Sequence, residues 1–181
     1  MLDTDPDFAH ALAFAARAHD GQTRKGAAGE PYVNHVIEVA EILVAHGAPR
    51  EAILAAYLHD TVEDTAVTPE ELAAEFGDAV ARIVAEVTDD KALPKEVRKG
   101  LQISHALVCS APAKQLKLAD KISNLRAIID SPPAAWNHAR RVEYVGWAGR
   151  VAAGLKGGNP ALDALFDATY RAALLRLAEE A

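Results

Sequence analysis

The chain contains 181 residues, of which 50% are apolar and 25% are charged, and its formal net charge is −7. This composition predicts one soluble globular domain over residues 1–181 and excludes disordered, collagen-like and mucin-like chains. The acidic balance argues against sequence-independent binding to nucleic acid, because that affinity comes from Lys and Arg side chains that neutralise many phosphates.

The predicted elements are helices, beginning with one that carries an apolar face (Phe8, Leu12 and Ala15-Ala16) and closes at His19-Asp20. A Gly-rich loop over residues 20–30 follows, and a loop of this length in a compact domain is often functional. The second helix is predicted from Pro31 to about Ala45. Its apolar side chains recur at helical spacing: Val33, Val36, Ile37, Ala40, Leu43 and Val44.

The remaining chain also shows helix signals. The segment from Ile53 to Leu58 is apolar on all sides, which indicates a short buried helix. Thr68 is then an N-cap, with Pro69 at the first helical position and Glu71 at the third, and Gly77 ends this helix. Further helices are expected over residues 78–87, 95–108, 113–129, 134–155 and 160–178, and at most a brief extended piece at 87–90. The predicted fold class is therefore all-α.

Hydropathy, the N-terminal segment and the cysteine content indicate where in the cell the protein is found. No window approaches the roughly 18 consecutive apolar residues of a membrane span. The acidic segment Met1–Asp7 also lacks the basic residues of a signal peptide. The single Cys109 can form neither an internal disulfide nor a Cys-based zinc cage. We therefore expect a cytoplasmic protein with no membrane partner, in which any metal is held by His and carboxylate side chains.

A crowded acidic segment is the first candidate for such a metal site. His59-Asp60 ends the buried segment and is followed by Glu63 and Asp64, so three carboxylates lie within five residues. Like charges at a helix C-terminus destabilise one another unless a cation neutralises them. The alternative is an exposed acidic loop screened by water. The other His-Asp pair, His19-Asp20, is interpreted as structural, because the helix dipole alone favours a His there.

Two further residues have open interpretations. His35 lies near the edge of the buried face of its helix, where a lone His is more often a hydrogen-bonded core residue than a ligand. Asp120 lies mid-helix, so it either pairs with Lys117 or Lys121 on the surface or points at a cation between helices, with Asn124 one turn on. Four residues together offer the mixed N and O ligands that suit Mn(II) or another catalytic divalent ion: His35, His59, Asp60 and Asp120.

Several motifs over about residues 8–166 resemble, in order, the HD-domain phosphohydrolases. The similarity is greatest to the hydrolase domain of RelA/SpoT proteins and to the stand-alone small alarmone hydrolases of the metazoan SpoT-homologue type. The motifs are Thr23-Arg24-Lys25-Gly26, Pro31-Tyr32-Val33-Asn34-His35, Leu58-His59-Asp60-Thr61-Val62-Glu63-Asp64-Thr65, Thr88-Asp89-Asp90-Lys91, Arg98-Lys99, Lys117-Leu118-Ala119-Asp120-Lys121-Ile122-Ser123-Asn124-Leu125, and Trp136 with Arg140, Tyr144 and Trp147.

The resemblance implies an HD-domain helical bundle with one Mn(II) on His35, His59, Asp60 and Asp120. It also implies hydrolysis of the 3′-pyrophosphate of the stringent-response alarmone (p)ppGpp to GDP or GTP and pyrophosphate. Glu63, with Asp64 beside it, would orient or deprotonate a metal-bound water. Arg24 and Lys25 would neutralise the pyrophosphate or flank the base, and Asn124 would donate a hydrogen bond from the metal-ligand helix. Lys95, Arg98 and Lys99 would contact the 5′-phosphates. The pocket would be lined by Trp136, Arg140 and Tyr144, unless these form an ordinary aromatic core stripe.

The chain also departs from the long bifunctional enzymes of this family. Ala127 stands where they carry Thr, seven residues after the last metal Asp, and 181 residues leave no room for a synthetase domain. Two alternatives remain open. The same metal site could serve a phosphatase acting on NADPH or a hydrolase acting on another nucleotide, or the chain could be a nucleotide-binding sensor without turnover.

Overall fold

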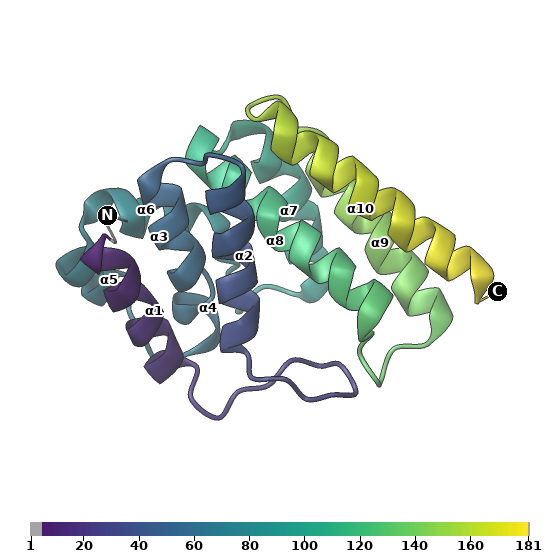
Figure 1. Cartoon of the computed structure of the whole chain (residues 1–181), viewed down its shortest axis with the longest axis horizontal. Helices are drawn as coiled ribbons and strands as arrows, with labels where there is room; N and C mark the ends of the chain where they lie inside the picture. The colour runs from purple at the N-terminus through teal and green to yellow at the C-terminus, as the bar shows by residue number, and fades with distance from the viewer. Residues whose placement is uncertain (1–4, 181) are drawn as a thin grey trace.

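The computed structural model describes residues 5–180, and within this range the chain forms helices and no β-strand (Figure 1). This confirms the predicted all-α class. Part of the acidic N-terminal segment, residues 1–4, lies outside the described residues. The helices are α1 (Pro6–Ala18), α2 (Val33–Ala45), α3 (Arg50–Leu58), α4 (Thr61–Asp64), α5 (Pro69–Phe76), α6 (Asp78–Val87), α7 (Lys95–Val108), α8 (Ala111–Asp130), α9 (His138–Leu155) and α10 (Pro160–Glu179).

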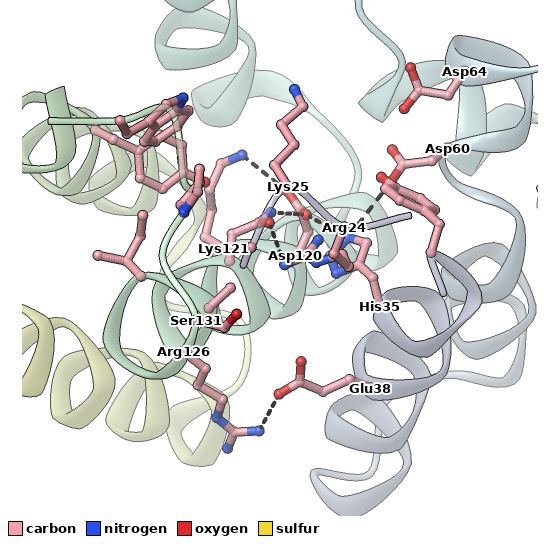
Figure 2. A pocket seen from close by; sticks show the side chains of 18 of the residues that line it. Arg24, Lys25, His35, Glu38, Asp60, Asp64, Asp120, Lys121, Arg126 and Ser131 are labelled. Carbon is pink, nitrogen blue, oxygen red and sulfur yellow. Dashed lines mark hydrogen bonds and ion pairs between the residues drawn. The ribbon is translucent and has the colours of Figure 1, made fainter. Parts of the chain in front are cut away.

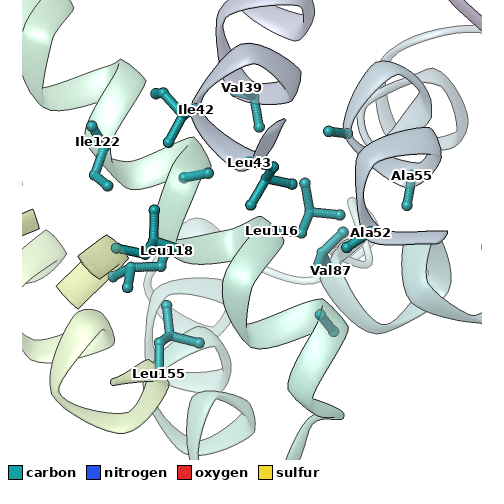
Figure 3. Close-up of a cluster of buried hydrophobic side chains, with 14 of the residues drawn as sticks. Val39, Ile42, Leu43, Ala52, Ala55, Val87, Leu116, Leu118, Ile122 and Leu155 are labelled. Carbon is teal, nitrogen blue, oxygen red and sulfur yellow. The ribbon is translucent and has the colours of Figure 1, made fainter. Parts of the chain in front are cut away.

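Helix α8 is the central element. It packs against α2, α3 and α6 and also against α9 and α10, with the last two on the side of α8 opposite α2 and α3 (Figure 1). Its inward side chains, among them Leu116, Leu118 and Ile122, meet Val39 and Leu43 of α2 in the apolar core (Figure 3). Since its neighbours lie on several sides, α8 is buried along most of its length. Among the described residues, no helix has the length and hydropathy that crossing a membrane requires.

Helix α2 buries a wider face than its spacing predicts. Val39, Ile42 and His35 are buried as well as Val36, Ala40 and Leu43. Val33 and Ile37 are half-buried, and Val44 is 56% exposed, so the predicted stripe is wrong at Val44. His35 lies in the interior and not at the edge of the buried face. The reason is that α3 and α8 both pack against α2.

Several helix ends differ from the prediction because capping residues and contacts with distant segments determine them. The helix predicted from residue 134 begins only at His138, where Asn137 caps it by accepting a hydrogen bond from the Arg140 amide at 2.9 Å. The Ala134 amide instead donates to the Lys25 carbonyl at 3.1 Å. Helix α8 starts two residues early, since Ser110 caps it and Pro112 is tolerated in its first turn.

The segment after residue 45 shows two more differences. Helix α3 already begins at Arg50. Residues 61–64 form the one-turn helix α4, where the sequence predicts either an exposed acidic loop or carboxylates that bind a cation. The predicted capping box at Thr68 and Glu71 is confirmed, with both hydrogen bonds present. The helix that it starts ends at Gly77, as expected, with a positive φ of 83°.

The loop over residues 20–30 is folded back on itself and on the start of the α8–α9 connection. The Arg24 amide donates to the Glu30 carbonyl at 2.8 Å, and isolated β-bridges join Thr23 with Pro31 and Gly26 with Pro133. Gly26 lies so close to Ser131 that an added Cβ would collide with its side chain and carbonyl. A glycine is therefore required for this contact between the loop and the end of α8.

The packing around α8 gives a stability prediction. Leu116 is fully buried in the core, so Leu116→Ala should lower the free energy of unfolding by about 2–5 kcal/mol through lost apolar contact and a residual cavity. Leu175→Ala is the matched control, because Leu175 on α10 is 61% exposed, and its effect should stay within about 0.5 kcal/mol. Urea denaturation measures both values. Equal losses for the two variants would contradict the assignment of Leu116 to the core.

Candidate active site

Two imidazoles and two carboxylates converge where α2, the α3–α4 corner and α8 meet. Figure 2 shows three of these residues, His35, Asp60 and Asp120. The Nε2 atom of His35 lies 3.3 Å from Asp120 Oδ1 and 3.7 Å from Asp60 Oδ2. The Nε2 atom of His59 lies 3.1 Å from Asp60 Oδ2 and 3.9 Å from Asp120 Oδ1. One ligand atom from each of His35, His59 and Asp120 lies within 4.8 Å of the others, so these three residues could hold one metal ion.

The hydrogen bonds of His59 show that this donor set suits a divalent cation. Its Nδ1 lies 2.8 Å from the Ala56 carbonyl, which can only accept, so Nδ1 carries a proton. In the neutral imidazole, Nε2 then carries a lone pair that is directed at carboxylate oxygens. This Nε2 atom is buried and has no hydrogen-bond partner. A lone pair facing carboxylates in a dry site requires a positive charge between them.

The charges of the two imidazoles and the two carboxylates influence one another. Burial opposes protonation of His59, but the adjacent Asp60 carboxylate raises the pKa of His59 to about 9. Burial lowers the pKa of His35 below its ordinary value. Burial alone would raise the pKa of Asp60, yet the charge on His59 holds it well below its usual range. A proton on His59 thus offsets negative charge that a divalent cation would offset more fully.

Asp60 lies at the edge of the cluster and is held there by an aromatic hydroxyl. The Tyr32 hydroxyl donates to Asp60 Oδ2 at 2.5 Å. Burial and the negative charge of Asp60 raise the pKa of Tyr32 above its ordinary value, so the hydroxyl stays protonated and keeps donating. The tyrosine therefore contacts Oδ2 of Asp60 and makes no hydrogen bond with Oδ1.

Asp120 is buried, with 9% of its side chain exposed, so the interpretation of a surface ion pair is wrong. Lys121 does pair with it, at 3.0 Å from Oδ2, but the pair lies in the interior. Lys117 instead donates to the Val87 carbonyl at 2.9 Å. Asn124, one turn after Asp120, donates to Asp120 Oδ1 at 2.6 Å and does not project freely for a ligand.

Glu63 and Asp64 follow the cluster on α4 but have different surroundings. Glu63 is half-buried, and its Oε2 accepts the Asp89 amide at 3.0 Å; burial raises the pKa of this carboxyl. The Asp89 carboxylate is held in turn by Gln102 at 2.8 Å. Asp64 is exposed and forms an ion pair with Lys91. The two carboxylates therefore differ in solvation, and Glu63 is the one placed in a partly dry environment.

A cavity of about 770 Å³ opens over the cluster, and its wall contains every site residue expected from the sequence except His59, which lies beneath it. Arg24 reaches from the 20–30 loop to Asn124 Oδ1 at 3.2 Å. Ala127, the departure from the long enzymes, also lines this wall. The basic residues expected from the sequence that line the cavity are Arg24, Lys25, Lys95, Arg98, Lys99 and Arg140.

The aromatic group lines the cavity as well and is not a simple core stripe. Trp136 precedes α9, so it does not continue the helical spacing of Arg140 and Tyr144. Its ring lies 5.3 Å from Tyr144 between centroids, and the Arg140 guanidinium lies 4.8 Å over the Trp136 ring. These three residues give one wall of the cavity both aromatic surface and positive charge.

Some residues that shape the site received no role from the sequence alone. Tyr32 lies three residues before His35, Glu38 lies three residues after it, and Ser123 lies three residues after Asp120. Gln102 follows Arg98 by four. Helical spacing of three or four residues from each candidate would have selected all of them, because such residues share one face of a helix.

Comparison with known proteins gives a consistent result. A model of the HD domain family matches residues 11–148. The guanosine-3′,5′-bis(diphosphate) 3′-pyrophosphohydrolase MESH1 of Danio rerio is 51% identical over 152 residues, covering 83% of this chain and 84% of that protein. The human protein of the same name is 48% identical and covers 83% and 85%. Both matches therefore cover more than four fifths of the relative's length.

Solved structures show the same fold. A metazoan ortholog of SpoT, described as hydrolyzing ppGpp, superposes with a TM-score of 0.90 at 41% identity, covering 94% of this chain and 97% of that one. A protein of Listeria monocytogenes superposes with a TM-score of 0.67 at 30% identity, covering 80% and 99%. The helical arrangement around α8 is therefore shared with solved structures.

The cluster gives a prediction about cation binding. Asp120→Asn removes a negative charge from the site and keeps its size, so it should weaken Mn(II) binding at least about 10-fold, as calorimetric titration of metal-stripped protein would measure. Asp130→Asn, at the exposed end of the same helix, is the matched control and should bind as the unchanged protein does. Equal affinities for both variants would contradict a metal site at Asp120.

Proposed function

Because the chain belongs to the HD-domain family, we propose that it hydrolyses the 3′-pyrophosphate of (p)ppGpp to GDP or GTP and pyrophosphate. The observation that carries this proposal is the position of the His/Asp cluster in a cavity whose wall is rich in cationic side chains. The relatives named for this activity support it. We take residues 1–181 as a single hydrolase domain with a small nucleotide as its partner, acting in the cytoplasm.

The proposed metal is Mn(II), with His35, His59, Asp60 and Asp120 as its ligands. When bound, such a cation lowers the pKa of a coordinated water and withdraws charge from a phosphoryl oxygen. Hydrogen-bond donors around Asp60 and Asp120 orient these two carboxylates. Tyr32 holds Asp60, and Asn124 and Lys121 hold the two oxygens of Asp120.

Glu63 is the proposed general base. One of its oxygens is fixed by the Asp89 amide, which orients the carboxylate, and burial raises the pKa of the group toward the working pH. A carboxyl with a raised pKa accepts a proton from the attacking water more readily than an ordinary one. Asp64, exposed and paired with Lys91, is better suited to shape the entrance near Glu63 than to accept this proton.

The distribution of positive charge fits a nucleotide with phosphates at two positions. Among the described residues, Arg24, Lys25 and Lys95 line the cavity without a carboxylate partner. Lys99 is paired with Glu143, and Arg98 lies 3.8 Å from Asp89. We therefore assign Arg24 and Lys25 to the 3′-pyrophosphate side. Lys95 is the principal contact to the 5′-phosphates, with Arg98 and Lys99 beside it.

The aromatic wall supplies a place for the base. The Trp136 and Tyr144 rings are adjacent, and Arg140 covers one of them, so a purine could stack against this surface. Ala127 adds a small apolar patch where the long enzymes carry a hydroxyl.

The activity itself is the first test. Metal-stripped protein should release GDP and pyrophosphate from ppGpp only after Mn(II) is added, because a bound cation would activate the water that attacks the phosphoryl group. NADPH, assayed alongside, should lose phosphate more slowly. Turnover of NADPH or a nucleoside monophosphate in place of ppGpp would keep the metal site and refute the substrate. Binding of ppGpp without products would instead indicate a sensor.

A second prediction separates the base from the metal. Glu63→Gln should lower kcat about 10²- to 10⁴-fold, the range for loss of a general base, while Mn(II) binding stays unchanged. Glu70→Gln, an exposed substitution on α5, is the control for the change of charge and should retain full activity. Full activity of Glu63→Gln would refute the assignment of the base.

A further inference from the structure

A chain of side-chain hydrogen bonds connects His35 with a carboxylate at the cavity wall. The Nδ1 atom of His35 lies 2.9 Å from Ser123 Oγ, and Ser123 Oγ lies 2.6 Å from Glu38 Oε2. Ser123 is buried, with 1% of its surface exposed, whereas the Glu38 side chain is 33% exposed. Glu38 and His35 are neighbours on α2, and Ser123 reaches them from α8.

The number of available protons fixes the direction of these bonds. A serine hydroxyl has one proton, and an ionised carboxylate has none, so Ser123 donates to Glu38. Its oxygen is then left to accept a hydrogen bond from His35, which places the imidazole proton on Nδ1. The Nε2 atom of His35 consequently presents a lone pair to Asp120 and Asp60.

Glu38 is itself held in place. Arg126 donates to its second oxygen, Oε1, at 2.9 Å, and this ion pair lies at the cavity wall (Figure 2). Both carboxylate oxygens are thus engaged, one by the guanidinium and one by the serine. The carboxylate therefore cannot turn away from Ser123 without breaking the pair with Arg126.

We propose that Glu38 and Ser123 are positioning residues that keep His35 in the tautomer with a metal-binding Nε2 and so raise the affinity of the site for a divalent cation. The proposal rests on the metal site described above but not on the identity of the nucleotide. Hydrogen-bond acceptors behind a ligating imidazole orient the ring and increase its basicity as a ligand. The other imidazole, His59, is held by the Ala56 carbonyl of its own helix, so only His35 depends on side chains for this orientation.

The first readout is the tautomer of His35 in metal-free protein, measured from the ¹⁵N shifts of its two ring nitrogens. In the unchanged protein, the proton should reside on Nδ1. In Ser123→Ala that acceptor is lost, and the proton should move to Nε2, where Asp120 Oδ1 lies 3.3 Å away. A merely structural role of Ser123 would not move this proton.

The second readout is calorimetric titration with Mn(II) alone. Ser123→Ala should bind about 10- to 100-fold more weakly. Glu38→Gln, at a partly exposed position where folding is retained, should weaken binding in the same direction but less, because an amide still accepts from the serine. Glu41→Gln, an exposed substitution on the same helix, should bind as the unchanged protein does.

Two results would overturn the proposal. One is a proton that stays on Nδ1 in Ser123→Ala, and the other is unchanged Mn(II) affinity in both Ser123→Ala and Glu38→Gln. Neither measurement involves a nucleotide. A failure of the proposed (p)ppGpp hydrolysis would therefore be distinguishable from a failure of this proposal.

Discussion

Two carboxylates, the buried Asp120 and the half-buried Asp60, lie beside two buried imidazoles, and the site depends on how their charge is compensated. Removing a charge from water costs several kcal/mol per ion even in a relaxed protein interior, so Asp60 and Asp120 require compensation. Tyr32, Lys121 and Asn124 provide part of it, since each donates to a carboxylate oxygen. Asp60 Oδ2 and Asp120 Oδ1 accept such bonds and also face the two imidazole Nε2 atoms, an arrangement that is favourable when a cation lies among them.

The packing of the helices brings these four residues together. They come from three places in the sequence, and α8 holds the arrangement together by serving two purposes. Leu118, Ile122 and Leu125 on α8 are buried in the core, while Asp120 and Asn124 of the same turns line the cavity. The 3.6-residue period permits both, because residues two apart point to different faces of a helix. A shift of α8 relative to α2 would disturb the core and the site at the same time.

The sequence predicts the local features well and the long-range ones poorly. The helices, the capping box at Thr68 and the cavity-lining basic residues follow from spacing, caps or motif resemblance. The start of α9 has a local signal, the N-cap Asn137, but the bond of the Ala134 amide to the Lys25 carbonyl, more than one hundred residues away in the chain, could not be found this way. Whether Asp120 lies on the surface or between helices cannot be predicted from the sequence for the same reason. Its burial, and its pairing with Lys121 inside the protein, result from the packing of α8 against α2 and α9, which no pattern within one helix records.

The folded-back loop over residues 20–30 has a consequence for how tightly an anion can be held. Long basic side chains on a free loop would lose conformational entropy on meeting a phosphate, and that loss would subtract from the binding free energy. Here the backbone at Arg24 and Lys25 is already fixed, by the bond to Glu30 and by the contacts with Pro133 and Ala134. The backbone part of this ordering is therefore complete before a ligand arrives, and under the proposed function the loop would meet a phosphate with its main chain already in place.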